Sequence, residues 1–371
     1  MFSDPTLASL AAMVLGLVLL VVGGALLVRG ASRLAAALSV PPLVVGLTVV
    51  AFGTSAPELA VSVKAACSGN ADLAVGNVVG SNIFNVLFIL GSSAIIIPLT
   101  VSIDLIRRDV PLMILASCAI WGMSVDGSIS RGEAALLSIG LIAYTVSCIL
   151  TAKRSVAASA VAAPNVSEAL MSSESAELRP APQPVGVRQV SISLVLAVVG
   201  LALLAVGSDA LVGGAVQIAG AFGVSQLVIG LTIVAAGTSL PEVVTSLVAA
   251  VRGERDLAVG NVVGSNLFNI LCVLGVSGLL SEQPIPVSDA ARQFDLPVMT
   301  AVAVACLPVF ISGHSISRWE GILFVAVFVV YLAIIIAAAG TEQWTVGGTT
   351  AMWLAAPLLL LAVLPLLPLR K

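Results

Sequence analysis

Two glutamates stand in the middle of apolar stretches that are each long enough to cross a membrane. Glu58 ends the motif GTSAPE at 53–58, and Glu242 ends the motif GTSLPE at 237–242. A carboxylate at bilayer depth costs about 3 kcal/mol on insertion scales, so it is normally partnered or functional. Apart from Lys64 near one end, neither stretch contains Lys or Arg. The simplest remaining partner for each carboxylate is a bound cation.

The residues beside each glutamate add further oxygen atoms. Pro57 and Pro241 lack an N–H group, so the carbonyls of Gly53 and Gly237, four residues earlier, lose their donors within the helix. Hydroxyl groups stand next to these prolines at Thr54, Ser55, Thr238 and Ser239. Carboxylate, carbonyl and hydroxyl oxygens together suit hard cations such as Ca²⁺ and Na⁺ better than softer transition metals.

The following apolar stretch in each case carries a polar stripe. Its members are four residues apart and would lie along one helix face: Asn77, Ser81 and Asn85 in the first case, and Asn261, Ser265 and Asn269 in the second. These side chains could line the same cation site. Asn77 and Asn261 would serve equally well in hydrogen bonds between helices.

The two glutamate regions are copies of one another. Residues 46–91 and 230–275 align without a gap at an offset of 184, and 30 of the 46 aligned positions are identical. Packing alone would let the residues drift among Leu, Val and Ile, but Gly, Thr, Ser, Pro, Glu, Asn and Asp are retained in both copies. Such a pattern is typical of transporters built from internal repeats, with the site at the repeat interface.

Composition places these motifs in a membrane protein. The chain of 371 residues is 59% hydrophobic and 9% charged, with a mean hydropathy of +1.15, which excludes a soluble enzyme. Apolar stretches of about 18 residues or more can span the bilayer. Spans are predicted at 9–28, 40–66, 72–97, 108–125, 131–152, 190–212, 224–250, 256–280, 294–312 and 318–339, with an eleventh near 349–369.

The duplication also predicts the domain organisation. Matches continue on both sides of the core motif, so each repeat is expected to hold five helices, and an odd number makes the second repeat inverted. The fold class is therefore an all-α polytopic membrane protein. We expect a first repeat at 1–152, a flexible cytoplasmic linker at 153–189, a second repeat at 190–339, and a short linker with the eleventh helix at 340–371.

The distribution of Lys and Arg predicts the orientation. With eleven spans and the N-terminus outside, 13 of the 16 basic residues face the cytoplasm, and only Lys64, Arg131 and Arg292 face outward. With ten spans the division is 11 against 5. Both divisions favour an outer N-terminus by the positive-inside rule, and eleven spans place the C-terminus in the cytoplasm. The cell (inner) membrane is the expected location.

The doubled motifs resemble a known family. GTSAPE with GNVVGSNIFN, and GTSLPE with GNVVGSNLFN, are similar to the paired α-repeats of the sodium/calcium exchanger family, part of the calcium:cation antiporter superfamily, in its prokaryotic form. The resemblance covers ten helices. It implies exchange of Ca²⁺ for Na⁺ by alternating access at a central site formed by four helices.

The resemblance also implies a role for each motif residue. Glu58 and Glu242 would be the carboxylates shared by Ca²⁺ and Na⁺. The other implied ligands are the backbone carbonyls of Thr54 and Thr238 for Ca²⁺, then Ser55, Ser239, Ser81, Ser265 and the carbonyls of Ala51 and Ala235 for flanking Na⁺ sites, with Asn85 and Asn269 completing the centre.

One position departs from several relatives. Potassium-dependent exchangers and some prokaryotic members carry Asp where this chain has Asn269. The expected centre then holds two carboxylates, whose formal charge of −2 one Ca²⁺ or two Na⁺ would balance. Potassium dependence is therefore not expected, and exchange of either two or three Na⁺ per Ca²⁺ stays open.

Two rival functions use the same residues. A Ca²⁺/H⁺ antiporter would also need two membrane glutamates, although its relatives typically lack GTSxPE. A cation channel would tolerate the same oxygen-rich lining without needing matched inverted repeats. No nucleotide-binding motif is visible, so ATP-driven pumping is not expected. The chain is expected to be no enzyme, to need no cofactor, and to have ions and lipid rather than nucleic acid or protein as partners.

Overall fold

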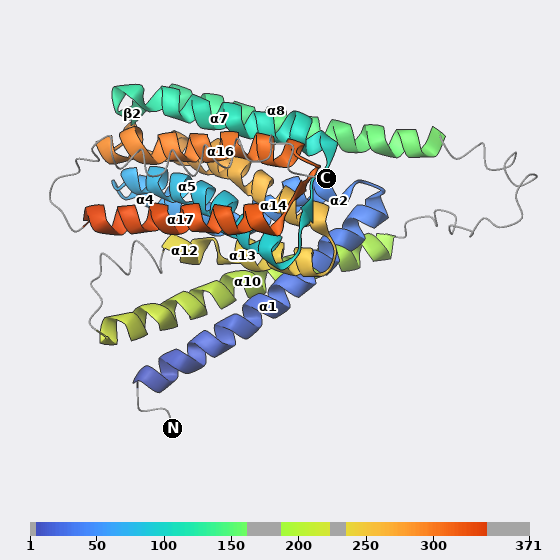
Figure 1. Cartoon of the computed structure of the whole chain (residues 1–371), viewed down its shortest axis with the longest axis horizontal. Helices are drawn as coiled ribbons and strands as arrows, with labels where there is room; N and C mark the ends of the chain where they lie inside the picture. Colours follow the sequence, from blue (N-terminus) through green and yellow to red (C-terminus); the bar gives the residue numbers. More distant parts are fainter. Residues whose placement is uncertain (1–4, 162–186, 223–234, 340–371) are drawn as a thin grey trace, which may run out of the picture.

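The computed structural model describes residues 5–161, 187–222 and 235–339, and these residues are almost entirely helical (Figure 1). The helical segments of the first half are α1 (Pro5–Leu38), α2 (Pro42–Val45), η1 (Gly46–Val50), α3 (Ala51–Thr54), α4 (Ala56–Cys67), α5 (Asp72–Phe84), η2 (Asn85–Leu90), α6 (Gly91–Ile96), η3 (Leu105–Asp109), α7 (Val110–Met123), η4 (Ser124–Asp126) and α8 (Arg131–Val161). Those of the second half are α10 (Val187–Ala221), α12 (Ala235–Thr238), α13 (Leu240–Val251), α14 (Arg255–Phe268), η6 (Asn269–Leu274), α15 (Gly275–Leu280), η7 (Ala291–Asp295), α16 (Leu296–Ile311) and α17 (Arg318–Ala339).

Most predicted spans correspond to helices of the described residues. Eight helices there are long and apolar enough to cross a membrane, and the bent pair Pro42–Thr54 and Ala56–Cys67 makes a ninth. The predicted span 224–250 begins outside the described residues, and its second part forms α12 and α13. The predicted eleventh helix at 349–369 lies wholly outside them. Helix α8 continues past Ala152 to Val161, into the segment predicted as a linker.

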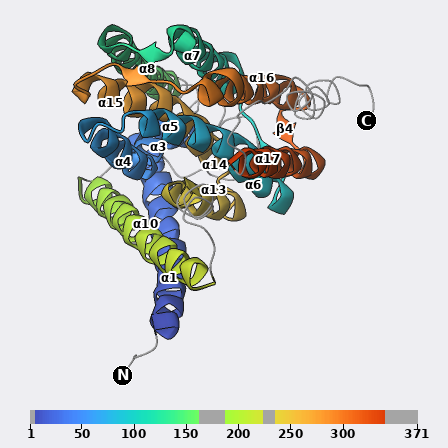
Figure 2. The same cartoon turned by 90° about the vertical axis from the view of Figure 1, so that its left-hand side faces the viewer.

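Helices α1 and α10 are longer than predicted and form a pair of their own. They lie side by side and run obliquely to the other helices (Figures 1 and 2). Their apolar stretches, at Leu7–Leu38 and Arg188–Ala221, exceed the roughly 20 residues that a perpendicular helix needs. Tilting is the usual way for such a helix to keep its apolar surface within the bilayer.

A seam of glycines joins α1 to α10. Glycines recur every seven residues on both helices, at Gly16, Gly23 and Gly30 and at Gly200, Gly207 and Gly214. A Cβ at Gly16 would lie 2.6 Å from the backbone nitrogen of Leu211, and one at Gly200 would lie 2.6 Å from that of Leu27. The backbones therefore touch directly, in antiparallel order. Small residues allow this close approach where helices pack in lipid.

The centre of the molecule is formed by one continuous helix from each half. The helix α5–η2–α6 has 67% of its apolar window buried inside the protein, and α14–η6–α15 has 89%, against 22% for α8 and α17. These two central helices carry the stripes that end at Asn85 and Asn269. Each of these two asparagines begins a π-helical segment, a feature that often accompanies functional sites.

Short β-ribbons join the two halves reciprocally. Strand β1 (Leu99–Thr100) pairs antiparallel with β4 (Ser315–Ile316), and β2 (Ser128–Ile129) pairs antiparallel with β3 (Ile285–Pro286). β1 and β3 follow equivalent helices, and β2 and β4 precede equivalent helices. In the duplication, β1 thus corresponds to β3, and β2 corresponds to β4. Each ribbon therefore pairs two strands that are not counterparts of each other.

The helices that follow β2 and β4 begin in the same way. Before α8, the backbone N–H and hydroxyl of Ser130 both donate to Glu133 Oε2 at 2.8 Å. Before α17, Ser317 donates to Glu320 Oε2 in the same way at 2.7 Å. Both are capping boxes, which satisfy N–H groups at a helix start. The duplication therefore includes the helix starts as well as the glutamate motifs.

Candidate cation site

Each glutamate motif breaks its helix at the serine. Helix α3 ends at Thr54 and α4 begins at Ala56, and the two sections that meet there are bent by 45°. In the second half, α12 ends at Thr238 and α13 begins at Leu240. Proline is the second residue of both α4 and α13, where its missing N–H costs little. The breaks agree with the donors that these prolines lack, and each glutamate lies in the first turn of the following helix.

One of the carbonyls expected to be free is occupied by a side chain. The Ser208 hydroxyl on α10 donates to the Gly237 carbonyl at 2.6 Å. A neighbouring helix thus supplies a donor in place of the one that Pro241 lacks, and the carbonyl oxygen keeps a second lone pair. Added Cβ atoms at Gly53 and Gly237 would meet the side chains of Leu201 and Val212 within 2.5 Å. Both breaks therefore lie against α10.

The two glutamates are held across the interface between the halves. Ser55 Oγ donates to Glu242 Oε1 at 3.1 Å, and Ser239 Oγ donates to Glu58 Oε1 at 3.0 Å. Glu58 is 0% exposed and Glu242 is 1% exposed. Each broken helix thus supplies a carboxylate and a hydroxyl that binds the opposite carboxylate. The reciprocal bonds bring both carboxylates to one buried point.

The glutamates and the asparagines that end the two polar stripes each keep one buried oxygen without a hydrogen-bond partner among the described residues. These atoms are Glu58 Oε2, Glu242 Oε2, Asn85 Oδ1 and Asn269 Oδ1. Within the described parts of the chain, neither glutamate forms a salt bridge. Leaving a buried acceptor unpaired is costly, and more so for a charged group. Carboxylate and amide oxygens are ligands that suit hard cations, so these unpaired acceptors fit Ca²⁺ and Na⁺.

The other expected ligands lie on the helices that carry the glutamates and on the two central helices. Thr54 is buried, and its hydroxyl donates to Asn261 Oδ1 at 3.3 Å. The Ser81 and Ser239 hydroxyl oxygens are hydrogen-bonded at 3.2 Å. Of the remaining residues, Ser265 is buried on α14, Ala51 is buried at the start of α3, and Ala235 and Thr238 begin and end α12.

Asn77 and Asn261 connect neighbouring helices, which was one of their two expected roles. Asn77 donates to Ser62 Oγ on α4 at 2.9 Å and to the Glu58 carbonyl at 3.2 Å. Asn261 donates to Ser246 Oγ on α13 at 3.0 Å. These bonds hold each glutamate-bearing helix to the following helix. Ser62 and Ser246 were not singled out in the sequence, although both copies of the repeat contain them.

A second pair of asparagines was also missed. Asn82 and Asn266 stand three residues before Asn85 and Asn269, and their side chains bond across the two halves. Asn85 Nδ2 donates to Asn266 Oδ1 at 3.0 Å, and Asn269 Nδ2 donates to Asn82 Oδ1 at 3.1 Å. Their identity in both copies of GNVVGSN was the available signal, but only the contacts show what they touch.

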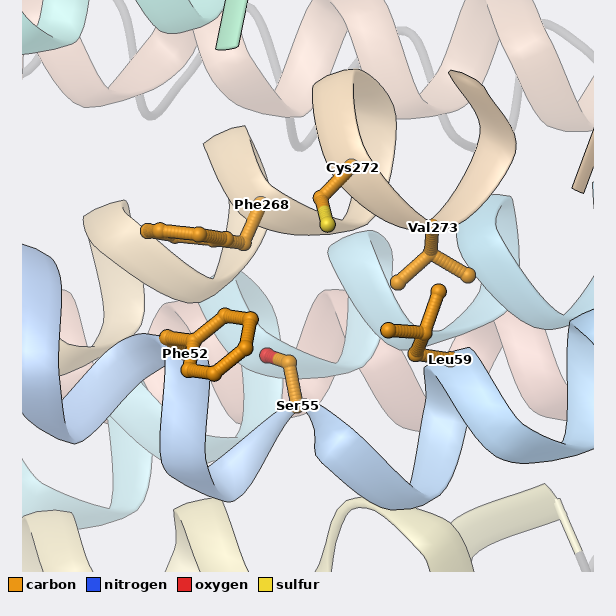
Figure 3. A pocket seen from close by; sticks show the side chains of 6 residues that line it. All are labelled: Phe52, Ser55, Leu59, Phe268, Cys272 and Val273. Carbon is orange, nitrogen blue, oxygen red and sulfur yellow. The ribbon is translucent and has the colours of Figure 1, made fainter. Parts of the chain in front are cut away.

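A narrow pocket adjoins the site on one side. It is lined by Phe52, Ser55, Leu59, Phe268, Cys272 and Val273. Figure 3 shows the Ser55 hydroxyl pointing into it, with the Phe52 and Phe268 rings on one side and Leu59 and Val273 on the other. The two ring centroids are 5.6 Å apart. Ser55 therefore stands between an apolar pocket and the buried Glu242 carboxylate.

The reciprocal serine bonds predict matched effects of two substitutions. Ser55→Ala and Ser239→Ala each remove a hydroxyl donor from a buried carboxylate, an interaction typically worth about 1.5–3 kcal/mol. If the carboxylate orientation matters for cation binding, each variant should raise the KM for Ca²⁺ roughly tenfold or more. Ion uptake into proteoliposomes measures this. Ser193→Ala on α10, which removes a hydroxyl bonded to the Gln189 carbonyl, is the control. Unchanged KM values in both site variants would contradict this account.

Comparisons with known proteins agree with this architecture. The family described as "Sodium/calcium exchanger protein" matches residues 8–150 and 192–337. The "Putative antiporter CaxA" of Alkalimonas amylolytica is 42% identical over 319 residues, covering 85% of this chain and 95% of its own length. The "Sodium/calcium exchanger MaX1" of Methanosarcina acetivorans is 34% identical over 344 residues, covering 87% and 97%.

A solved structure extends the agreement to three dimensions. The sodium/calcium exchanger from Methanococcus jannaschii superposes with a TM-score of 0.73 at 31% identity, over 88% of this chain and 98% of that one. Both halves of the chain and the helical arrangement are thus shared with the same group of membrane transporters. This protein belongs to the sodium/calcium exchanger family.

Proposed function

We propose that this protein is a secondary antiporter that exchanges Na⁺ for Ca²⁺ by alternating access at the site between Glu58 and Glu242. The observation that carries the proposal is the reciprocal arrangement of these buried carboxylates, each held by the serine of the opposite broken helix. One oxygen of each carboxylate and the amide oxygens of Asn85 and Asn269 are buried without a partner among the described residues, which supports the proposal. The family and the names of two relatives support the choice of ions.

The proposed ion sites follow from the charges and donor atoms. Two carboxylates give a formal charge of −2, so one Ca²⁺ or two Na⁺ balance the centre. Asn85 and Asn269 add neutral amide oxygens to it. The Thr54 and Thr238 carbonyls are assigned to Ca²⁺. The flanking Na⁺ sites are assigned to Ser55, Ser239, Ser81, Ser265 and the carbonyls of Ala51 and Ala235.

Coupling arises from the cost of an uncompensated charge. Two bare carboxylates in a closed, water-free site would be strongly disfavoured. The site therefore changes its access only when Ca²⁺ or Na⁺ neutralises it, and the two ions compete for the same carboxylates. An inward Na⁺ gradient would in this way drive Ca²⁺ out of the cell.

We further propose that the two halves are inverted five-helix repeats. Identity at 30 of 46 aligned positions supports this, as do the reciprocal Ser–Glu bonds. The ribbons add a topological argument, because β1 pairs with β4 and β2 with β3. A twofold axis in the membrane plane would relate β1 to β3 and β4 to β2. It would therefore exchange one ribbon with the other, on the opposite side of the membrane.

The orientation proposed is an outer N-terminus in the cell (inner) membrane. The division of Lys and Arg, 13 against 3 for eleven spans, supports it. Strand pairing requires both members of a ribbon to lie on the same side. Counting spans meets this requirement, and with an outer N-terminus it puts β1 and β4 in the cytoplasm and β2 and β3 outside.

Uptake of radiolabelled Ca²⁺ into Na⁺-loaded proteoliposomes tests the proposal. Replacing external Na⁺ with choline should drive Ca²⁺ inward, and equal Na⁺ on both sides should stop the uptake. Uptake driven instead by an imposed pH gradient would move the protein to the Ca²⁺/H⁺ class, because the same two glutamates can carry protons. Ca²⁺ flux that needs no counter-gradient would indicate a channel.

A further inference from the structure

We infer that Asn82 and Asn266 are positioning residues, which force the amides of Asn269 and Asn85 to present oxygen rather than NH₂ to the bound cation. This inference rests on the proposed function and deepens it. An asparagine differs from a carboxylate because its two ends are chemically opposite. A neutral amide helps to hold Ca²⁺ or Na⁺ only when its oxygen faces the ion.

The orientation of Asn82 follows from acceptors that cannot donate. Its Nδ2 lies 3.3 Å from the backbone carbonyl of Asn266 and 3.7 Å from the thioether of Met299. A carbonyl and a thioether only accept hydrogen bonds, so the NH₂ end of Asn82 must face them. Asn82 Oδ1 then faces Asn269, whose Nδ2 donates to it at 3.1 Å. This leaves Asn269 Oδ1 at the end of the amide that Asn82 does not bind, buried and without a partner among the described residues.

The second half of the centre repeats this logic. Asn266 Nδ2 lies 3.5 Å from the thioether of Met113, so its amide oxygen faces the other way. Asn85 Nδ2 donates to that oxygen at 3.0 Å. Asn85 Oδ1 is the atom left buried and unpaired. Met113 and Met299 stand two residues after Pro111 and Pro297, so corresponding helices of the two halves supply the sulfur acceptors.

Burial makes the orientation consequential. Asn82 and Asn266 are each 2% exposed, and the asparagines that they orient are no more exposed. Water is thus largely absent as an alternative partner. A reversed amide at position 269 would direct an NH₂ group toward the cation and place two amide oxygens against each other. Both consequences are unfavourable in a buried polar network.

The inference predicts that Asn82→Leu weakens Ca²⁺ binding by at least about tenfold, because it frees the amide of Asn269 to turn. Equilibrium binding of radiolabelled Ca²⁺ to the purified full chain in detergent measures this directly. Met113→Leu, which nearly conserves volume, should weaken binding about threefold through Asn266. Ser93→Ala removes another buried side-chain oxygen, on α6, and should leave binding unchanged. The thermal unfolding midpoint of each variant reports on its folding.

A second substitution separates orientation from packing. A carboxylate has two equivalent oxygens and needs no orienting, so Asn269→Asp should repair the Asn82→Leu variant. In the wild-type background the same change places the new carboxylate against Asn82 Oδ1. The factor by which Asn269→Asp improves Ca²⁺ affinity should therefore be at least about tenfold larger in the Asn82→Leu background than in the wild type. A double-mutant cycle measures this difference.

Three outcomes would overturn the inference. The first is unchanged Ca²⁺ affinity in both Asn82→Leu and Met113→Leu. The second is an Asn269→Asp effect of the same size in both backgrounds, which would mean that the added charge acts alone. The third is an absence of Ca²⁺ binding by the wild type. The binding assay is independent of the uptake assay. If the variants change Ca²⁺ binding as expected but the wild type shows no Na⁺-driven Ca²⁺ uptake, the exchange function is rejected and the positioning role is supported.

Discussion

Glu58→Gln and Glu242→Gln are each expected to reduce Na⁺-driven Ca²⁺ uptake more than about a hundredfold. Two unit charges 4 Å apart interact with about 4 kcal/mol at an effective dielectric constant of 20, and a divalent ion doubles this. The glutamine oxygen recovers part of the loss, and every 1.4 kcal/mol corresponds to a factor of ten in affinity. The remaining centre, with a charge of −1, cannot neutralise Ca²⁺. Proteoliposome uptake at saturating and limiting Ca²⁺ measures the loss.

The same charge argument distinguishes the two ions. The Coulomb energy lost with one carboxylate is twice as large for a divalent ion as for a monovalent ion. The affinity for Ca²⁺ should therefore fall further than the affinity for Na⁺. Glu133→Gln is the matched control, since Glu133 lies in the capping box of α8 rather than in the site. Full uptake in either site variant, or an equal loss in the control, would contradict the two-carboxylate centre.

Gly23→Ala combined with Gly200→Ala is expected to give the largest loss of stability. Added Cβ atoms would lie 2.8 Å from the Gly200 carbonyl and 2.6 Å from the Leu27 nitrogen. These are backbone atoms and cannot rotate away, so α1 and α10 must separate. Overpacking costs about 1–3 kcal/mol at a single site, and here two sites in one seam are changed. A lower unfolding midpoint in detergent, with less monodisperse protein, is the expected result.

Gly213→Ala provides the control on α10 itself. No described atom lies within 4 Å of a Cβ at Gly213, so the substitution changes the helix without touching the seam. Its unfolding midpoint should stay close to that of the wild type. A double seam variant as stable as this control would show that α1 and α10 do not need direct backbone contact.

Much of the fold could be predicted because a membrane simplifies the relation between sequence and structure. Lipid requires every backbone polar group to be satisfied internally, so an apolar stretch of sufficient length becomes a helix. The described spans accordingly lie close to the predicted ones. The breaks at Ser55 and Ser239 were also predictable, because proline removes one particular hydrogen bond. Helices α1 and α10 exceeded their predictions, since length alone does not reveal tilt.

The sequence by itself determined which residues are candidates to carry the chemistry. Glu58, Glu242 and the polar residues beside them are retained in two copies within apolar stretches, where polar side chains are energetically unfavourable. This pattern can be recognised without coordinates. The sequence could not determine what those residues touch. That Ser55 holds Glu242 rather than Glu58 depends on contacts between segments 187 residues apart. The hydrogen bond from Ser208 to the Gly237 carbonyl depends on such contacts as well. So do the bonds that Asn85 and Asn269 donate to Asn266 and Asn82. Hydrogen bonds have direction and short range, so only the tertiary structure decides which donor meets which acceptor.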